Sequence, residues 1–292
     1  MERHEQNNSS LGIALILSAM FVFATQDALT KTLVDTYAAP QILLIRFSFY
    51  ILFALAYAKR RKPLRQCLKS AAPWLQIARS LLIVAEIGMF IVSIRFLSLA
   101  EMHSLFATFP LMVTAIAALF MGEKVGIRRW AAVFVGFLGV LVILRPGFGE
   151  LKPGVLFALL TAFMFAIYNV LTRLVARYDD SETSMVYMGL IGFVTMAFVG
   201  PFFWIPPTQT DWLLLLALSI SGTAGHFLLI KALEAAPAST LQPFNYTMLV
   251  FAGFYGWAVF DNIPDVWTIA GSAIVVASGL YVIYRERRRA KA

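Results

Sequence analysis

The first half of this chain repeats in its second half, inside long apolar runs. Gly12 opens the run GIALILSAMFVFATQDALTK, and Gly154 opens GVLFALLTAFMFAIYNVLTR 142 residues later. When the runs are superposed, apolar and small residues coincide, and Asp27 meets Asn169. Duplicated units of this kind are common in transporter folds, in which two related halves enclose a central path. The repeat therefore predicts two halves of one architecture with a path between them.

The composition indicates a membrane protein. Apolar residues make up 60% of the chain and charged residues only 14%, whereas a soluble domain carries about 25% charged residues. The first apolar run, 11–33, is too long for the core of a signal peptide and lacks a small-residue cleavage site, so we expect no cleaved leader. The single cysteine, Cys67, excludes an internal disulfide, and its basic loop favours a free cytosolic thiol.

Ten segments are long and apolar enough to cross a bilayer core, which takes about 20 residues of helix. They are 11–33, 40–58, 76–97, 100–121, 127–145, 154–176, 184–204, 212–234, 238–260 and 266–284. The third and fourth segments nearly touch in sequence, as do the eighth and ninth, so each pair predicts a tight helical hairpin. Strands are excluded because an open sheet leaves backbone groups unpaired in lipid.

Basic residues predict the orientation. They gather in the loops after the second, fourth and sixth segments and in the tail 285–292, all on one side of a ten-span arrangement. Such loops face the cytoplasm, which places both chain ends there. The net charge of +8 is then an orientation signal, and we expect no nucleic-acid partner.

An odd number of spans in each half turns the second half upside down relative to the first. The predicted fold is therefore an all-α integral membrane protein of ten transmembrane helices, built as two inverted five-helix repeats. The halves are expected at 11–146 and 153–284, followed by a basic cytoplasmic tail at 285–292.

Several short motifs carry a resemblance to a known family. They are QDALTK at the end of the first segment, IRF at 45–47, and ALFMGEK at the end of the fourth segment. With these motifs the chain resembles the drug/metabolite transporter superfamily, and within it the EamA-type members. Where the second half would match the Gly-Glu pair, it has Phe260 and Asp261.

The resemblance implies a secondary transporter of a bacterial inner membrane that moves a small organic metabolite by alternating access. Riboflavin uptake is the leading substrate prediction. Import of S-adenosylmethionine and export of amino acids or related metabolites stay open as alternatives. A membrane-embedded enzyme and a sensor or scaffold are more remote alternatives, the first because no compact acid/base or metal group is visible near an interface.

Ionisable residues inside a span are costly, at about 2.5–3.5 kcal/mol each on insertion scales, so each calls for an explanation. Glu86 lies inside the third segment, and His226 occupies a related position in the eighth. Each is read either as a buried group with a neighbouring helix for partner or as a group lining the path. If both line the path, they form a proton relay, because histidine changes charge near neutral pH.

The ends of the first and sixth segments carry matching polar residues. Gln26 and Asp27 in the first, and Tyr168 and Asn169 in the sixth, are candidate substrate contacts. Asp27 and Lys31 are four residues apart, which predicts a local pair on one helix face. Arg46 is expected to be a structural or gating residue, with Asp27 as its candidate partner.

The fourth and ninth segments combine polar, aromatic and proline residues. His103 and Phe106 in the fourth are further candidate substrate contacts. In the ninth, Gln242, Asn245 and Tyr246 fit one face of an α-helix and are candidate hydrogen-bonding groups. Structural or gating roles are expected for Pro110 and Pro243, which free backbone carbonyls, and for Glu123 and Asp261, which end these two segments.

The sequence has no phosphate-binding GxxxxGK[ST] loop and no Cys/His cluster with the spacing of metal ligands. We therefore expect no catalytic residues, no cofactor, no metal and no enzymatic activity. Energy for active transport would come from a proton gradient or from exchange. The expected partners are a small-molecule substrate and the lipid bilayer, and the oligomeric state stays open.

Overall fold

The computed structural model describes residues 9–120, 126–145, 153–236 and 241–290. These residues form helices joined by short connections, with no strand among them. In chain order, the elements of the first half are α1 (Ser9–Leu33), α2 (Ala39–Arg61), α3 (Leu64–Cys67), α4 (Pro73–Phe96), α5 (Leu99–Phe106), α6 (Phe109–Phe120) and α7 (Ile127–Leu144). Those of the second half are α8 (Pro153–Val175), α9 (Ser181–Val199), η1 (Gly200–Phe203), α10 (Gln209–Ala235), η2 (Gln242–Tyr246), α12 (Thr247–Phe260) and α13 (Val266–Ala290).

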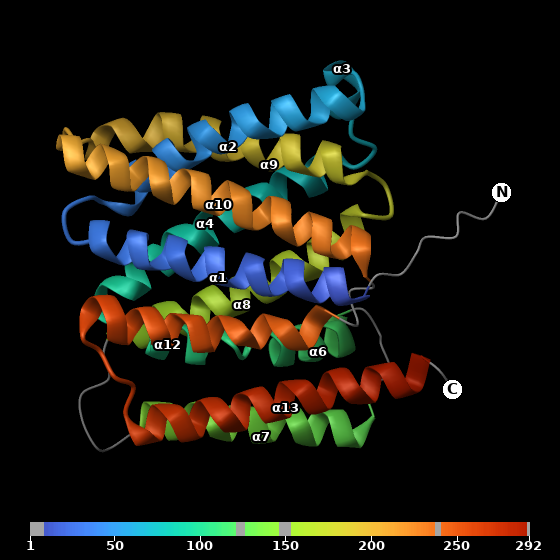
Figure 1. Ribbon diagram of the computed structural model, residues 1–292. Helices are drawn as coiled ribbons and strands as arrows, with labels where there is room; N and C mark the ends of the chain where they lie inside the picture. Colours follow the sequence, from blue (N-terminus) through green and yellow to red (C-terminus); the bar gives the residue numbers. More distant parts are fainter. Residues whose placement is uncertain (1–8, 121–125, 146–152, 237–240, 291–292) are drawn as a thin grey trace.

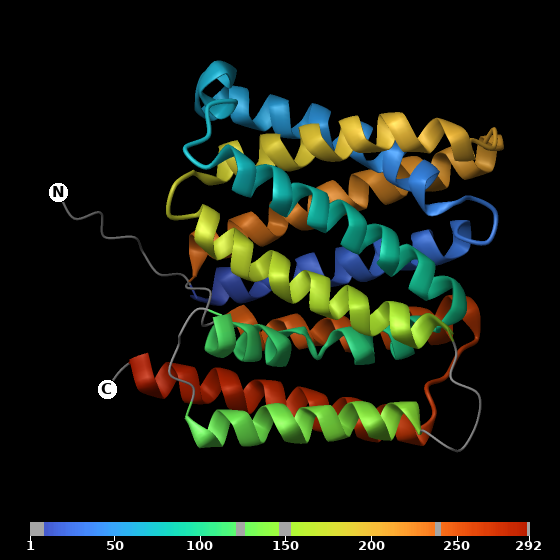
Figure 2. The ribbon, with the colours of Figure 1, turned by 180° about the vertical axis from the view of Figure 1, so that it is seen from behind.

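The long helices lie side by side, and their connections gather at two opposite ends of the bundle (Figures 1 and 2). The start of α1, the end of α13 and the short helix α3 lie at one end, and the start of α8 lies at the other. α1 and α8 therefore run in opposite directions, as inverted repeats require.

Within the described residues, nine helices are long and apolar enough to span a bilayer. The 3-10 helix η2 and the helix α12 follow one another directly and supply a further crossing over residues 242–260. Together these crossings confirm the predicted ten-helix, two-repeat membrane fold. The mostly apolar outer surface fits this environment, since large side chains such as Leu156, Phe198 and Leu213 are exposed.

The hairpin between α4 and α5 follows from local sequence. Ser98 is the N-cap of α5, and its hydroxyl accepts a hydrogen bond from the Glu101 amide at 3.2 Å. In turn, the Glu101 carboxylate accepts a hydrogen bond from the Ser98 amide at 2.8 Å, which completes a capping box. This pair satisfies amide groups that would otherwise be orphaned at the turn, so the predicted tight hairpin forms here. The second predicted hairpin falls on residues 237–240, outside the described residues.

The span predicted at 100–121 is found as a crossing over Leu99–Ile116, but this crossing is not one regular helix. The helix is interrupted at Ala107 and Thr108, between α5 and α6. Pro110 has no amide hydrogen for the Phe106 carbonyl, and its ring clashes with that carbonyl in a regular helix. Pro243 acts similarly in the second half, where the chain forms the 3-10 helix η2 instead of an α-helix. Within the described residues, both halves thus carry a proline at the second position of a helix in the corresponding crossing.

The main helix–helix interfaces are preserved when each helix is replaced by its counterpart in the other half. In that exchange α1 becomes α8, α2 becomes α9, α4 becomes α10 and α7 becomes α13. The most extensive interfaces are α1 with α10, α7 with α13, α4 with α8 and α2 with α9. The exchange converts α1–α10 into α8–α4, and it converts α2–α9 and α7–α13 into themselves. The interfaces therefore have the pseudo-two-fold relation of inverted repeats.

Cys67 ends the short helix α3 and is a free, buried cysteine. Its side chain packs with Ala58 and Val186, so the loop that carries it is folded against α2 and α9. Burial raises the pKa of this thiol above its usual value. The free thiol expected from the sequence is therefore shielded.

The interface between α7 and α13 depends on two glycines. A Cβ at Gly271 would lie 2.6 Å from the Gly139 carbonyl oxygen and 2.5 Å from Ile143 Cγ1. We expect Gly271→Ala to destabilise the purified protein by about 1–3 kcal/mol, because backbone atoms must move to admit the methyl group. Gly253→Ala is the matched control, since nothing lies within 4 Å of its added methyl group. Thermal unfolding in detergent measures both, and equal stability of the two variants would contradict this account of the interface.

Candidate functional site

A buried contact between a carboxylate and an imidazole joins the first crossing to the one that contains α5. His103 Nε2 of α5 lies 3.0 Å from Asp27 Oδ2 of α1, with side chains 5% and 9% exposed. Gln26 donates a hydrogen bond to the other carboxylate oxygen of Asp27 at 3.0 Å. The capping box at Ser98 fixes where α5 begins and so holds His103 opposite Asp27. Three residues predicted from two segments, Gln26 and Asp27 from the first and His103 from the fourth, therefore meet in the interior.

Arg46 of α2 adds a positive charge to this group. It lies within electrostatic range of Asp27 and of Glu86, which is 4% exposed on α4. Gly222 of α10 makes room for this approach: a Cβ there would lie 2.4 Å from Gln26 Oε1 and 3.6 Å from Arg46 Nε. The predicted association of Arg46 with Asp27 fits this arrangement.

His226 of α10 borders the same group through its ring. Its centroid lies 5.1 Å from that of Phe23 and 6.0 Å from that of Tyr50. It is also within electrostatic range of Arg46. The direct contact between a carboxylate and an imidazole belongs to Asp27 and His103, so the relay through Glu86 and His226 stays a prediction.

The local pair predicted from the spacing of Asp27 and Lys31 is replaced by contacts to other elements. Asp27 pairs with His103, as above. Lys31 donates to the carbonyls of Ile94 and Leu97, at 2.7 and 2.9 Å. These carbonyls end α4, where a cation compensates the helix dipole.

Aromatic rings continue from His103 into the second half. Phe106 contacts His103 at 6.4 Å between centroids and Phe165 at 5.1 Å. Phe165 stacks on Tyr168 at 5.9 Å, and Phe90 of α4 lies 5.6 Å from His103. We call Phe90, Phe106, Phe165 and Tyr168 the aromatic strip. It brings the predicted residues Phe106 and Tyr168 together, although they come from different halves.

The remaining candidate substrate contacts, in α8 and η2, lie apart from Asp27, His103 and the aromatic strip. Asn169 donates to the Phe165 carbonyl of its own helix at 2.7 Å. Tyr246 faces Gly279 of α13, where a Cβ would lie 1.7 Å from its hydroxyl. The predicted face of Gln242, Asn245 and Tyr246 assumed an α-helix, but these residues lie in a 3-10 helix of about three residues per turn. In such a helix positions three apart align, so position 246 turns away from the row of positions 242 and 245. The side chain of Gln242 lies outside the described residues.

Of the four other residues with expected structural roles, the three that the structure describes lie at helix ends. Pro110 is the second residue of α6, and Pro243 is the second of η2. Asp261 follows α12 with φ 52°, in the left-handed region that closes helices. Glu123 falls on 121–125, outside the described residues.

Sequence reasoning missed several residues of this interior. Arg79 is the most important, since it is 3% exposed on α4 and its guanidinium lies over the Tyr168 ring at 5.4 Å. Its signal was available, because an ionisable residue inside an apolar run is the same signal that selected Glu86. Gly222 and Phe165 gave no such signal, since glycine and phenylalanine are ordinary residues in spans.

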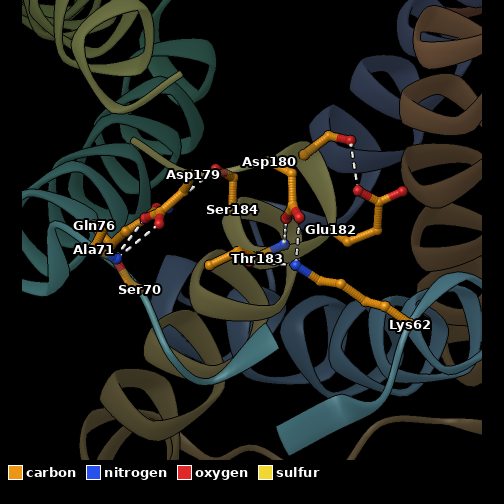
Figure 3. A network of polar contacts seen from close by, with 10 residues as sticks. Lys62, Ser70, Ala71, Gln76, Asp179, Asp180, Glu182, Thr183 and Ser184 are labelled. Carbon is orange, nitrogen blue, oxygen red and sulfur yellow. Dashed lines mark hydrogen bonds and ion pairs between the residues drawn. The ribbon is translucent and has the colours of Figure 1, made fainter. Parts of the chain in front are cut away.

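A second polar cluster joins the two halves at the end of the bundle that carries α3 (Figure 3). Lys62 forms an ion pair with Asp180, the N-cap residue of α9, and donates to Thr183 Oγ1 at 2.8 Å. The cluster also contains Asp179 and the three residues that donate to it, Ser70, Ala71 and Gln76. We call this cluster the end clamp, and the sequence analysis did not identify it.

Asp179 accepts more hydrogen bonds than the other acid of the end clamp. It accepts hydrogen bonds from the Ser70 hydroxyl, from the Ala71 amide at 2.9 Å and from the Gln76 side chain at 2.9 Å. Partial burial raises the pKa of Asp179, but these three hydrogen bonds outweigh it and leave the pKa below its ordinary value. In Asp180, partial burial is likewise outweighed by Lys62 and Thr183, which lower the pKa.

Comparison with known proteins places the two halves in one family. Residues 10–145 and 152–285 each match the EamA-like transporter family. One solved crystal structure superposes with a TM-score of 0.66 at 18% identity, covering 97% of this chain and 99% of that one. This likeness supports the fold.

Similar proteins of known name are transporters of small molecules. The S-adenosylmethionine uptake transporter of Rickettsia bellii is 24% identical, over 96% of this chain and 95% of that protein. The riboflavin transporter of Vibrio cholerae is 27% identical, over 96% and 95%. The pseudopaline exporter CntI of Pseudomonas aeruginosa is 26% identical, over 91% and 94%.

Acid titration provides a test of the end clamp. A lowered folded-state pKa stabilises the protein above the unfolded value of about 3.9, and this contribution is lost as the pH falls through the folded value. We expect Asp179→Asn to lose about 1–3 kcal/mol at pH 7, with the difference from wild type shrinking toward pH 3. Asp35→Asn, at a side chain 80% exposed, is the control. Thermal unfolding between pH 7 and pH 3 measures both, and a difference that stays constant with pH would contradict the assignment.

Proposed function

Because the chain belongs to the EamA-like transporter family, we propose that it moves a small, ring-bearing and charged metabolite by alternating access between its two halves. Membership of this family, together with relatives named as transporters, makes the protein a small-molecule transporter and not an enzyme. The substrate and the route are the proposal.

The buried pair of Asp27 and His103, with Arg46 and Glu86 around it, carries the proposal. Charged groups inside a membrane span are costly, and they mark substrate and ion pathways in membrane proteins. Opposite charges in one interior suit a substrate that itself carries charge, and the aromatic strip beside them offers rings on which a flat group stacks.

A metabolite of the S-adenosylmethionine type fits these features best, since it joins charged groups to a planar ring. The sequence alone ranked riboflavin first, and riboflavin is retained as the second candidate. The aromatic strip and the identity of 27% with a riboflavin transporter favour it. Coupling to protons or to exchange is part of the proposal, with Asp27 and His103, or Glu86 and His226, as its proton-carrying groups.

Uptake by proteoliposomes containing the purified protein tests the substrate. We expect labelled S-adenosylmethionine to accumulate above empty vesicles, and Asp27→Asn to reduce this by about tenfold or more through loss of a charge-assisted contact. Asp35→Asn, at the exposed end of the first crossing, should keep full uptake. Uptake of riboflavin alone would favour the second candidate, and full uptake by Asp27→Asn would remove the proposed route.

We also propose an inner-membrane location with both chain ends and α3 on the cytoplasmic side, on the strength of the basic loops. In a Cys67→Ser background, a membrane-impermeant maleimide applied to intact spheroplasts should label Asp35→Cys and spare Lys69→Cys. Both positions are exposed and lie outside the spans. Inside-out vesicles should reverse the pattern, and labelling of Lys69→Cys from the outer side would overturn the orientation.

A further inference from the structure

Arg79 is a cation buried in the interior of the bundle. It lies on α4 within a membrane span and is 3% exposed. Its position is set by three helices, since its contacts come from α4 itself, from α8 and from α9. A charge held this deeply needs compensation from its surroundings.

All hydrogen-bond partners of Arg79 among the described residues are neutral. Nη1 donates to the Tyr168 hydroxyl at 3.2 Å and to Thr172 Oγ1 at 3.5 Å. Nη2 donates to Gln76 Oε1 at 3.1 Å and to the Ser184 carbonyl at 2.9 Å. No group in the part of the chain that the structure describes accepts a hydrogen bond from the buried Nε hydrogen.

Arg79 therefore differs from the other interior arginine. Arg46 has Asp27 and Glu86 within electrostatic range, whereas none of the described carboxylates forms an ion pair with Arg79. The nearest link to an acid runs through Gln76, whose amide donates to Asp179. A planar guanidinium with an unused donor and no counter-ion is suited to receive an anionic group.

The surroundings of Arg79 connect it to the proposed substrate route. Its guanidinium covers the Tyr168 ring at 5.4 Å, and the aromatic strip continues from Tyr168 through Phe165 and Phe106 toward His103. On α4, Arg79 and Glu86 are seven residues apart, so they share one face at a rise of about 10 Å. Arg79 thus lies at one end of the row of rings, and His103 with its partner Asp27 lies at the other.

We propose that Arg79 is a specificity-determining residue that binds an anionic group, a carboxylate or a phosphate, on the transported molecule. The ring of that molecule lies on the aromatic strip, and its cationic or hydrogen-bond-donating end meets Asp27 and Glu86. This inference rests on the proposed transport function and names the chemistry that the route selects.

Matched ligand pairs that differ only in the anionic group provide the test. Titration calorimetry on the full chain in detergent would compare S-adenosylmethionine with its decarboxylated form, and riboflavin phosphate with riboflavin. We expect the wild type to bind the acidic member of at least one pair about tenfold or more tightly than its partner. Arg79→Gln should abolish that preference by weakening the acidic member alone, and Arg79→Lys, which keeps the charge and loses the fork, should retain part of it.

Arg95→Gln is the matched control, because it removes the same charge from the exposed end of the same helix and should leave the preference unchanged. Thermal unfolding and gel filtration establish that each variant is folded. Equal weakening of both members of a pair in Arg79→Gln and Arg79→Lys would make Arg79 a structural residue and overturn the proposal. A wild type that prefers the neutral members, or does not distinguish the members of either pair, would overturn it as well.

These outcomes are distinguishable from failure of the proposed function. Ligand binding is measured without a membrane, so a preference that depends on Arg79 supports the anion site even if proteoliposomes show no uptake. Uptake without any such preference supports transport and removes the anion site.

Discussion

The absence of water from the bilayer core governs this structure. A backbone group that faces lipid has no solvent partner, so every crossing is helical and every interruption occurs where other helices enclose it. The same constraint applies to side chains: Asp27, Glu86, Arg46 and Arg79 point into the bundle, where other groups of the protein take the place of water. Both the helical fold and the enclosed polar side chains thus follow from the absence of water in the bilayer core.

The pseudo-two-fold relation sets the architecture but does not extend to the chemistry. Asp27 in the first half corresponds to Asn169 in the second, and the two behave differently. Asp27 contacts the imidazole of His103 on another helix, whereas Asn169 donates a hydrogen bond to a carbonyl of its own helix. Two halves with one backbone plan therefore supply an unequal set of charges. That inequality gives the interior a direction, from the acidic group at Asp27 toward Arg79.

The sequence was sufficient to predict the ten-crossing fold, because apolar length and an odd number of crossings leave few arrangements. It also selected Asp27 and His103, which the structure brings together, since polar residues and histidines in spans stand out against an apolar background. It was misleading for Asp27 and Lys31, where spacing along one helix gave no information about partners on other helices. It missed Gly222 and Phe165, which matter only through what approaches them. The end clamp lay beyond prediction for the same reason, since Lys62 and Asp180 meet only after the halves have packed.

The interface between α7 and α13 joins two helices that correspond to each other in the two halves. A contact of this kind, in which a surface meets its own counterpart, is the contact that two separate copies of a half-length chain would make as a symmetric antiparallel dimer. The close approach of Gly139 and Gly271 lies within this self-paired interface. Because both surfaces belong to one chain, the two halves need not carry the same side chains, and a cation such as Arg79 can occur in one half alone.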